Sequence, residues 1–403
     1  MSSFAAAGSP VFKQINRAML AGGFSAFALL YCVQPLMPEM ARQFALTPAQ
    51  ASWTLSISTL TLAVSLVFSG ALSERVGRKP LMTCALLGAA LFGLLSAFAR
   101  NATELLVLRA LLGFALGGMP AVAMAYLNAQ IAPRSLGLAM GLYIGGTALG
   151  GMLGRVAASV ISDVYSWRLA LAVMGVAGLA AAWEFWRCLP PAQERASGQA
   201  GIKALLQGAR YHFSDAGLAW LFALAFLLMG VFVSLYNYIG YRLLDAPFGL
   251  GQSAVGALSV LYLLGMFSAV WAGRLADRIG RRNVLWIVML AMLAGLLLTL
   301  SNKLSVILAG MALFTFGFFA AHSVCSSWVG MRARGPQALA SAMYLFFYYT
   351  GSSVIGSLCG VVWSGAGWSG VVVLLAFTLG LALLIALHLR SLAPRPPALP
   401  AAA

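Results

Sequence analysis

Residues 70–79 read GALSERVGRK, and residues 273–282 read GRLADRIGRR. Both stretches fit the pattern Gly-x-x-x-(Asp/Glu)-Arg-x-Gly-Arg-(Lys/Arg), and about 200 residues separate them. Apolar runs lie on both sides of each copy, with roughly the 20 residues that a helix needs to cross a bilayer. The two stretches therefore read as equivalent short loops, each joining two apolar helices within a duplicated unit.

The composition indicates a surface that faces lipid. Of the 403 residues, 62% are hydrophobic and 8% are charged, whereas soluble domains carry roughly 25% charged residues. The apolar runs are too long and too uniform for barrel strands, in which polar and apolar residues alternate. We therefore predict an all-α polytopic membrane protein with twelve transmembrane helices in two pseudo-symmetric six-helix bundles.

The predicted spanning segments are 17–38, 51–72, 81–99, 104–125, 137–161, 167–189, 218–240, 254–275, 283–300, 304–324, 338–363 and 370–389. The N-terminal bundle then covers 1–189 and the C-terminal bundle covers 218–390. A cytoplasmic central loop covers 190–217, and a disordered cytoplasmic tail rich in Pro and Ala covers 391–403. Further features recur at nearly the spacing of the loops, namely Tyr31 with Tyr236, Gly113 with Gly317, and Trp167 with Trp368.

The net charge of +16 is best explained as a topology signal. Most of the 25 Lys and Arg residues lie in loops on one side if the chain crosses an even number of times. By the positive-inside rule, both termini are then cytoplasmic. No basic stripe is long enough to follow a phosphate backbone, so the pattern excludes nucleic acid as a partner.

Within the duplicated loop, each residue type has a local reason. Gly77 and Gly280 permit a tight turn, and Gly70 and Gly273 are expected to let neighbouring helices approach closely. The acid of each copy can pair with arginine. The predicted inner-gate motif comprises Gly70, Glu74, Arg75, Gly77, Arg78, Lys79, Gly273, Asp277, Arg278, Gly280, Arg281 and Arg282.

These motifs resemble those of the major facilitator superfamily. The loops resemble its signature between helices 2 and 3 and the weaker copy between helices 8 and 9. Residues 109–113, RALLG, resemble its helix 4 motif, and residues 146–155, GTALGGMLGR, resemble its helix 5 antiporter motif. That helix 5 motif comprises Gly146, Gly150, Gly151 and Gly154. The family prefers a Gly-Pro pair and a final glycine pair, whereas this chain ends the motif with Gly154-Arg155.

The resemblance is to bacterial arabinose-efflux and drug-efflux permeases in particular. It implies alternating access, in which two bundles rock about a central site, with the duplicated loops acting as latches at the inner face. It further implies export of drug-like or sugar-like solutes across the bacterial inner membrane by proton antiport. We expect a monomer without cofactor or metal.

Polar residues inside the spanning segments are the candidates for solute binding or coupling. A membrane arginine costs about 2.5–3.5 kcal/mol on insertion scales, and Gln34, Arg109 and Arg155 fall at similar depth in the outer third. We predict a polar cluster there, with Glu39, Glu104 and Asp163 as acidic neighbours. The structural alternative is that Arg109 clamps helix 4 to helix 1 and that Arg155 extends outward to Asp163.

Titratable groups for proton coupling are few. The candidates are Glu39, Asp163 and His322, of which the histidine titrates near neutral pH.

Tyr31 and Tyr236 are predicted either to meet across the cavity at its outer mouth or to serve as interfacial residues. The complete set of candidates is Tyr31, Gln34, Glu39, Arg109, Arg155, Asp163, Tyr236, Asn237 and His322.

Other classes of function fit less well. Residues 367–370, GWSG, have the form of intramembrane serine proteases, but no histidine lies at a matching depth. No Walker loop, metal cluster or dinucleotide fingerprint occurs, so neither ATP-driven pumping nor redox chemistry is indicated. A sensor would usually carry a soluble domain. Uptake of a small organic anion or other solute, by symport or facilitated diffusion, stays open. Two membrane arginines without deep acids favour an anion.

Overall fold

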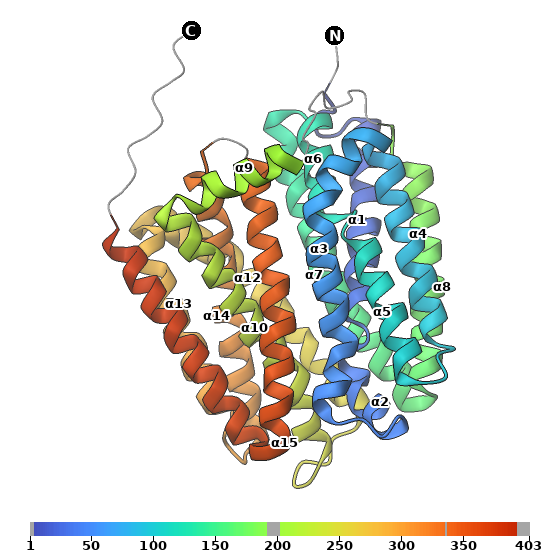
Figure 1. The fold of residues 1–403 in the computed structure, drawn as a ribbon, viewed down its shortest axis with the longest axis vertical. Helices are drawn as coiled ribbons and strands as arrows, with labels where there is room; N and C mark the ends of the chain where they lie inside the picture. Colours follow the sequence, from blue (N-terminus) through green and yellow to red (C-terminus); the bar gives the residue numbers. More distant parts are fainter. Residues whose placement is uncertain (1–3, 192–201, 335–336, 393–403) are drawn as a thin grey trace.

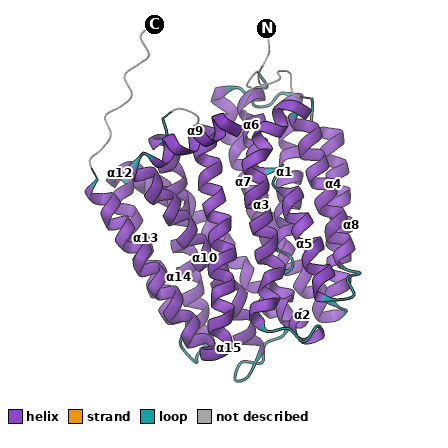
Figure 2. Ribbon diagram, in the orientation of Figure 1, coloured by secondary structure: helices purple, strands orange, loops and turns teal. Residues whose placement is uncertain are grey.

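The computed structural model describes residues 4–191, 202–334 and 337–392. This part of the chain is almost entirely helical and contains no β-strand (Figure 2). Two bundles stand side by side, the N-terminal one blue to green and the C-terminal one yellow to red (Figure 1). The all-α prediction is therefore confirmed. The predicted disordered tail lies, from residue 393 onward, outside the described residues.

The N-terminal bundle begins with α1, which is followed by short helices and then by five further long segments. Its elements are α1 (Pro10–Tyr31), the 3₁₀ turn η1 (Gln34–Leu36), α2 (Met37–Gln43), α3 (Pro48–Val76), α4 (Arg78–Ser96), α5 (Ala102–Leu116), α6 (Pro120–Gln130), α7 (Pro133–Val164) and α8 (Trp167–Cys188). The pair α5 and α6 together forms the fourth crossing.

The C-terminal bundle follows a helix that occupies part of the predicted central loop, α9 (Ile202–Phe213). Its elements are α10 (Ala216–Leu244), α11 (Gln252–Ala257), the 3₁₀ turn η2 (Leu258–Leu261), α12 (Tyr262–Ile279), α13 (Arg281–Leu298), α14 (Leu304–Arg332) and α15 (Gln337–Ser391). The segments α11, η2 and α12 together form one crossing.

Eleven segments of the described chain are long and apolar enough to cross a membrane. The last of them covers 53 residues, about 80 Å of helix at 1.5 Å per residue, against a bilayer core of about 30 Å. Within it Gly367 adopts a non-helical conformation with φ 57° and ψ −152°. The ribbon folds back there into two antiparallel arms (Figure 1), so α15 supplies two crossings and the total agrees with the predicted twelve.

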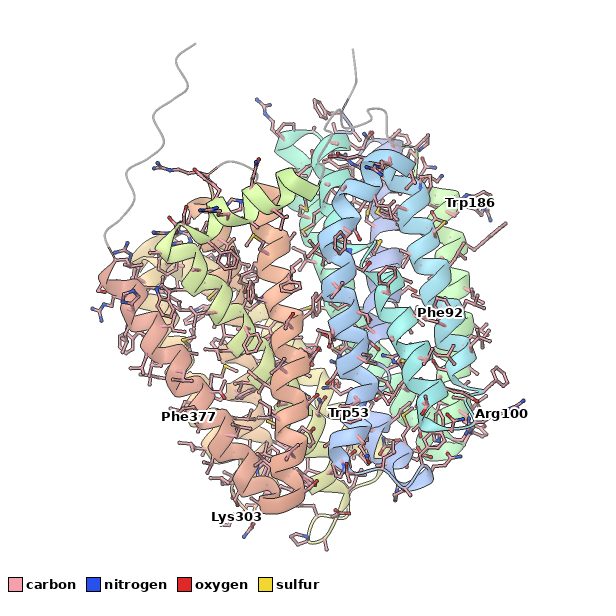
Figure 3. The ribbon with its side chains drawn as sticks, viewed as in Figure 1. Trp53, Phe92, Arg100, Trp186, Lys303 and Phe377 are labelled. Carbon is pink, nitrogen blue, oxygen red and sulfur yellow. The ribbon has the colours of Figure 1, made fainter. Side chains whose placement is uncertain are left out.

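The first turn of α1 and the last turn of α15 lie on one side of the molecule, here called the terminal side, and the opposite side is called the far side (Figure 1). Large apolar side chains point outward around the bundles, among them Trp53, Trp186 and Phe377, which are 45%, 48% and 65% exposed (Figure 3). Arg100 and Lys303 lie at the far side (Figure 3). This pattern is what a lipid-facing surface between two polar boundaries requires.

Two predicted helices are broken rather than continuous. α1 ends at Tyr31, and Gln34 lies in the following 3₁₀ turn η1 and not in the first helix as predicted. The fourth crossing is interrupted between Leu116 and Pro120. Proline has no backbone N–H and clashes with the preceding turn, so Pro35 lies in the first turn of a new segment and Pro120 begins one. The length of an apolar run alone does not predict these breaks.

The duplication extends to equivalent helix contacts. A Cβ on Gly150 of α7 would overlap the carbonyl oxygen of Phe24 in α1 and lie 2.6 Å from the Phe24 Cα. A Cβ on Gly351 of α15 would overlap the carbonyl oxygen of Phe226 in α10 and lie 2.6 Å from the Phe226 Cα. In each half, the first and fifth crossings therefore pack closely at an equivalent glycine, which supports the inferred repeat.

The predicted turn glycines have the conformation that the motif requires. Gly77 and Gly280 have φ values of 92° and 87°, which side chains rarely adopt. By contrast, a Cβ on Gly70 or Gly273 would meet nothing within 4 Å. The close helix approach expected at Gly70 and Gly273 is therefore absent from this conformation, because these glycines face open space.

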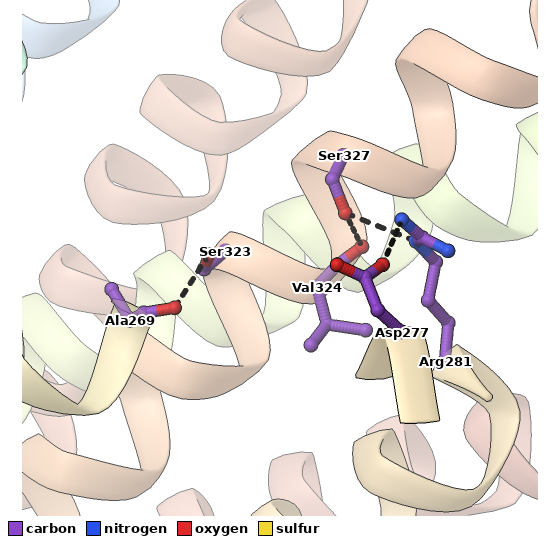
Figure 4. A network of polar contacts seen from close by, with 6 residues as sticks. All are labelled: Ala269, Asp277, Arg281, Ser323, Val324 and Ser327. Atoms are coloured by element: carbon purple, nitrogen blue, oxygen red, sulfur yellow. Dashed lines mark hydrogen bonds and ion pairs between the residues drawn. The ribbon is translucent and has the colours of Figure 1, made fainter. Parts of the chain in front are cut away.

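The arginines after the turn glycines attach each loop to its own bundle. Arg78 Nη1 donates to the carbonyl of Ala125 in α6 at 3.1 Å. In the other half, Arg281 Nε donates to Ser327 Oγ of α14 at 3.3 Å, and Arg281 Nη2 pairs with Asp277 at 3.2 Å (Figure 4). Each loop is thus anchored to the fourth crossing of its half.

Candidate functional site

Gln34 links the two bundles through polar side chains. Arg155 of α7 donates from Nε to Gln34 Oε1 at 2.5 Å. Gln34 Nε2 then donates to Asn237 Oδ1 of α10 at 2.6 Å. All three side chains are buried, with exposures of 3% or less. The structure thus brings together three of the predicted candidates, one of which comes from the other half of the chain.

A small cavity of about 20 Å³ lies at this link and is lined by Gln34, Arg155, Tyr236, Asn237 and Ser259, among others. This volume suits one small polar group, since one water needs roughly 10–15 Å³ by this kind of measure. Asn237 Nδ2 has no hydrogen-bond partner in the described chain. We call this space the junction cavity.

Arg155 is held between aromatic rings. Its guanidinium carbon lies 4.3 Å from the ring centroid of Tyr31 and 5.0 Å from that of Tyr262. Nη1 donates to the Gly151 carbonyl at 2.5 Å. No carboxylate of the described residues pairs with it, so the predicted alternative of an extension to Asp163 is wrong. The ring faces stabilise the cation in place of a counter-ion.

Arg109 does not join this link. It is fully buried in α5 and donates to three backbone carbonyls, those of Leu29 at 3.1 Å, Leu30 at 2.6 Å and Thr54 at 3.1 Å. The first two belong to the last turn of α1, where carbonyl groups concentrate negative charge and favour a cation. This geometry favours the structural alternative, in which Arg109 clamps the fourth crossing to the first and second.

The acidic residues expected beside the arginines have other partners. Glu39 accepts a hydrogen bond from Ser162. Asp163 accepts from the backbone N–H and hydroxyl of Ser253 at 3.1 and 2.6 Å. Glu104 accepts from the Arg100 backbone N–H at 2.8 Å. The two arginines and the three acidic residues therefore do not form the single cluster that was predicted. Each of these side chains has its own, separate partners.

His322 lies deeper than predicted, because α14 continues as far as Arg332 instead of ending near 324. The predicted span 304–324 covers the length of a bilayer crossing, whereas the helix itself is longer. The His322 Nδ1 lies 2.9 Å from the Tyr344 hydroxyl, and the ring centroid lies 4.8 Å from that of Tyr348. His322 is therefore a titratable group inside the C-terminal bundle.

Tyr31 and Tyr236 approach the same region without a direct contact between their rings. Tyr31 contacts Arg155, and the Tyr236 hydroxyl lies 2.8 Å from Thr315 Oγ1. The Tyr236 ring packs edge-on against Tyr262 at 5.3 Å between centroids. Tyr262, which the sequence analysis did not select, therefore connects the two predicted tyrosines through Arg155.

The helix 5 motif forms a packing face. Cβ atoms on Gly146 and Gly154 would contact backbone atoms of Leu20 and Ala28 in α1 at 3.0 and 2.7 Å, on the same helix face as the Gly150 contact. Gly151 instead supplies the carbonyl that Arg155 binds. The motif therefore holds α7 against α1 and at the same time orients the arginine at its end.

Hydrogen bonds join the far halves of the two bundles. Besides the Gln34 link and the Asp163 contact, Ser353 of α15 bonds Thr59 Oγ1 and the Ser56 carbonyl, each at 2.7 Å. Gln252 donates to the Pro35 carbonyl. We call this set the far-side junction. The run of Ser and Thr residues in α3, from Ser52 to Thr59, was the available sequence signal for it.

Known proteins with similar sequences or folds are membrane transporters. Residues 19–245 match the model of the Major Facilitator Superfamily. The chain is 46% identical to the uncharacterized MFS-type transporter YybF of Bacillus subtilis, over 93% of both chains. It is also 46% identical to the inner membrane transport protein YnfM of Escherichia coli, over 96% of this chain and 93% of YnfM.

Among solved structures, a bacterial homologue of the human lysosomal transporter Spinster, in an inward-facing and unoccupied conformation, has a TM-score of 0.75. The sequence identity is 14%, and the match covers 95% of this chain and 96% of that one. This likeness concerns the fold alone. Together with the repeat, the family model and the two relatives, it leads to one assignment: the chain belongs to the major facilitator superfamily and is a membrane transporter of small molecules, not an enzyme.

Proposed function

We propose that the protein exports small drug-like or sugar-like solutes by alternating access, as a monomer in the bacterial inner membrane, with protons moving in the opposite direction. The observation that carries alternating access is the concentration of hydrogen bonds between the bundles at the far side. The far-side junction is closed by hydrogen bonds, whereas the duplicated loops, among the described residues, bond within their own bundles.

The terminal side is then the cytoplasmic side. The duplicated loops, with Arg75, Arg78, Lys79, Arg281 and Arg282, lie there, as the positive-inside rule requires. In the opposite state these loops act as latches. The open space at Gly70 and Gly273 supports this role, because it leaves room for a helix of the other bundle to approach.

Proton antiport requires a titratable group that the two states expose differently. His322 fits this role because it is partly buried among tyrosines and bonds the Tyr344 hydroxyl. Glu39 and Asp163 are the alternatives at the far side. Asp163 belongs to the far-side junction itself, so opening the junction removes the hydrogen bonds that its carboxylate accepts from Ser253.

Proton movement in energised inverted vesicles tests export and coupling together. Vesicles that contain the wild-type protein should release protons when an exported solute is added. Substitution of His322→Gln is expected to remove the proton response, since glutamine retains hydrogen bonding but has no group that takes up a proton. Neutral, cationic and anionic solutes are compared in parallel. Solute movement without any proton response would contradict antiport.

Uptake of a small organic anion is the second candidate. The specific observation in its favour is Arg155, a buried cation at the boundary of the two bundles with no carboxylate partner in the described chain. In the vesicle assay this candidate predicts movement of anionic solutes only, and no release of protons.

Gly256 offers a test of alternating access. A Cβ at this position would overlap Ser159 Cβ and Oγ of α7, so Gly256→Ala must separate α11 from α7. We expect a cost to the closed far side of about 1–3 kcal/mol, or roughly a 5- to 150-fold shift of the equilibrium. The measurement is the yield of cross-linking between cysteines that replace Asp163 and Ser253, which should fall.

The double variant Gly256→Ala with Ser159→Gly should recover cross-linking, because it removes the overlapping side chain. Gly380→Ala is the matched control, since a Cβ there would meet nothing within 4 Å. An unchanged yield in Gly256→Ala would show that the far-side junction does not open in the manner proposed.

A further inference from the structure

The Arg155 side chain is not fully satisfied by its own protein. Nε and Nη1 donate to Gln34 and Gly151, while Nη2 has no hydrogen-bond partner among the described residues. Arg155 is 3% exposed, and a buried cation is costly unless it is paired and hydrogen-bonded. The two tyrosine rings compensate for part of this cost. Their faces do not accept hydrogen bonds from Nη2 as an anion would.

The other open groups around Arg155 are also donors. Asn237 is 2% exposed and lines the junction cavity, and its Oδ1 is occupied by Gln34, which leaves Nδ2 without a partner. The Tyr262 hydroxyl, on a ring that contacts the guanidinium, is likewise unpaired. The junction cavity is lined by an arginine and an amide N–H and by no carboxylate, so it is chemically complementary to an anion.

We propose that the junction cavity binds a small monovalent anionic group, held by Arg155 and Asn237. The cavity volume of about 20 Å³ suits a small group such as a carboxylate or a chloride ion. The carboxylate would belong to the transported solute, whereas chloride would be a separate ion. The role of the bound anion in transport rests on the proposed alternating access. The binding of the anion does not depend on that proposal.

The position of the cavity between the two bundles determines how anion binding affects the far-side junction. Its walls come from both bundles, since Gln34 and Arg155 belong to the N-terminal half and Asn237 to the C-terminal half. An anion that bonds Arg155 and Asn237 at once adds a bond across the far-side junction. The anion therefore binds the closed far side more tightly than the open one, and it stabilises the closed state by that difference in affinity.

The test is thermal unfolding of the full-length protein in detergent. The buffers are matched in ionic strength and contain sodium acetate, sodium benzoate or sodium chloride, with benzamide as a neutral analogue of benzoate. We expect a concentration-dependent rise in Tm with these monovalent anions and none with benzamide. A rise with the carboxylates alone identifies a solute headgroup, and an equal rise with chloride identifies an inorganic ion.

Arg155→Gln and Asn237→Ala should each weaken the apparent affinity for the anion about 10- to 100-fold, because each removes a hydrogen bond of an ionised pair. Asn237→Ala keeps the cation and is the second variant if Arg155→Gln does not fold. Gly145→Ala, on the same helix in open space, should respond like the wild type.

The proposal is overturned if no monovalent anion raises the Tm of the wild type. It is also overturned if both variants respond as the wild type does. Neither result bears on alternating access, which the Gly256 cross-linking measures separately. A loss of the Gly256 effect together with an intact anion response would instead contradict the proposed function and leave the binding site standing.

Discussion

Gly150→Ala is expected to prevent stable packing of the N-terminal bundle. The added methyl group would overlap the carbonyl oxygen of Phe24 and approach the Phe24 Cα to 2.6 Å. These are backbone atoms of a neighbouring helix, so no side-chain rotation relieves the overlap. Overpacking in a close-packed interior costs about 1–3 kcal/mol when side chains can adjust, and here α1 and α7 must move apart along their length. We expect a loss of at least that size.

The measurement is the Tm of the purified protein and its monodisperse yield after extraction in detergent. Gly351→Ala should have an effect of similar size, because it recreates the same overlap with Phe226 in the other half. Gly145→Ala is the matched control on α7, since its Cβ would meet nothing within 4 Å. Equal Tm values for Gly150→Ala and Gly145→Ala would contradict the repeat contact as a determinant of the fold.

Arg109→Ala is expected to reduce stability as strongly, and by a different route. The variant loses three hydrogen bonds from a charged group to carbonyls of α1 and α3, each of which contributes about 1.5–3 kcal/mol. It also leaves a cavity in place of a side chain that is 0% exposed. Removing the buried charge offsets part of this loss. We expect a net destabilisation of about 3–5 kcal/mol.

Arg109→Lys separates charge from geometry. Lysine keeps the charge but lacks the planar fork that reaches three carbonyls at once, so it should restore only part of the lost Tm. The measurements are the Tm and the anion response of the folded fraction. Because Arg109 does not line the junction cavity, any folded Arg109→Lys protein should keep that response. A wild-type Tm in Arg109→Ala would exclude the clamp.

The contrast between the two arginines explains where sequence reasoning reached its limit. Arg109 and Arg155 fall at similar depth in adjacent crossings, and the sequence predicted one cluster. Whether a side chain points to a helix end or to the other bundle depends on how α1 terminates and on how the bundles meet. The break of α1 before Pro35 makes the carbonyls of Leu29 and Leu30 available to Arg109 and carries Gln34 toward Arg155.

The local sequence was sufficient to predict the crossings, the two halves and the turn glycines, because each of these features has a local physical cause. Apolar run length determined the twelve crossings, because a bilayer of constant thickness demands it. The repeated loop determined the two halves and their turn glycines, since only glycine adopts the positive φ of Gly77 and Gly280 without strain. The family assignment followed from the same motifs.

Tertiary structure decided which of the polar residues meet. The Gln34–Arg155–Asn237 link joins positions from both halves of the chain, and the partner of each depends on helix rotation, which no run of apolar residues specifies. It also decided that the far side is closed, and that Gly70 and Gly273 face open space in this state. The physical reason is that helix rotation and the packing between the bundles depend on contacts between residues far apart in the chain, which no local stretch of sequence specifies.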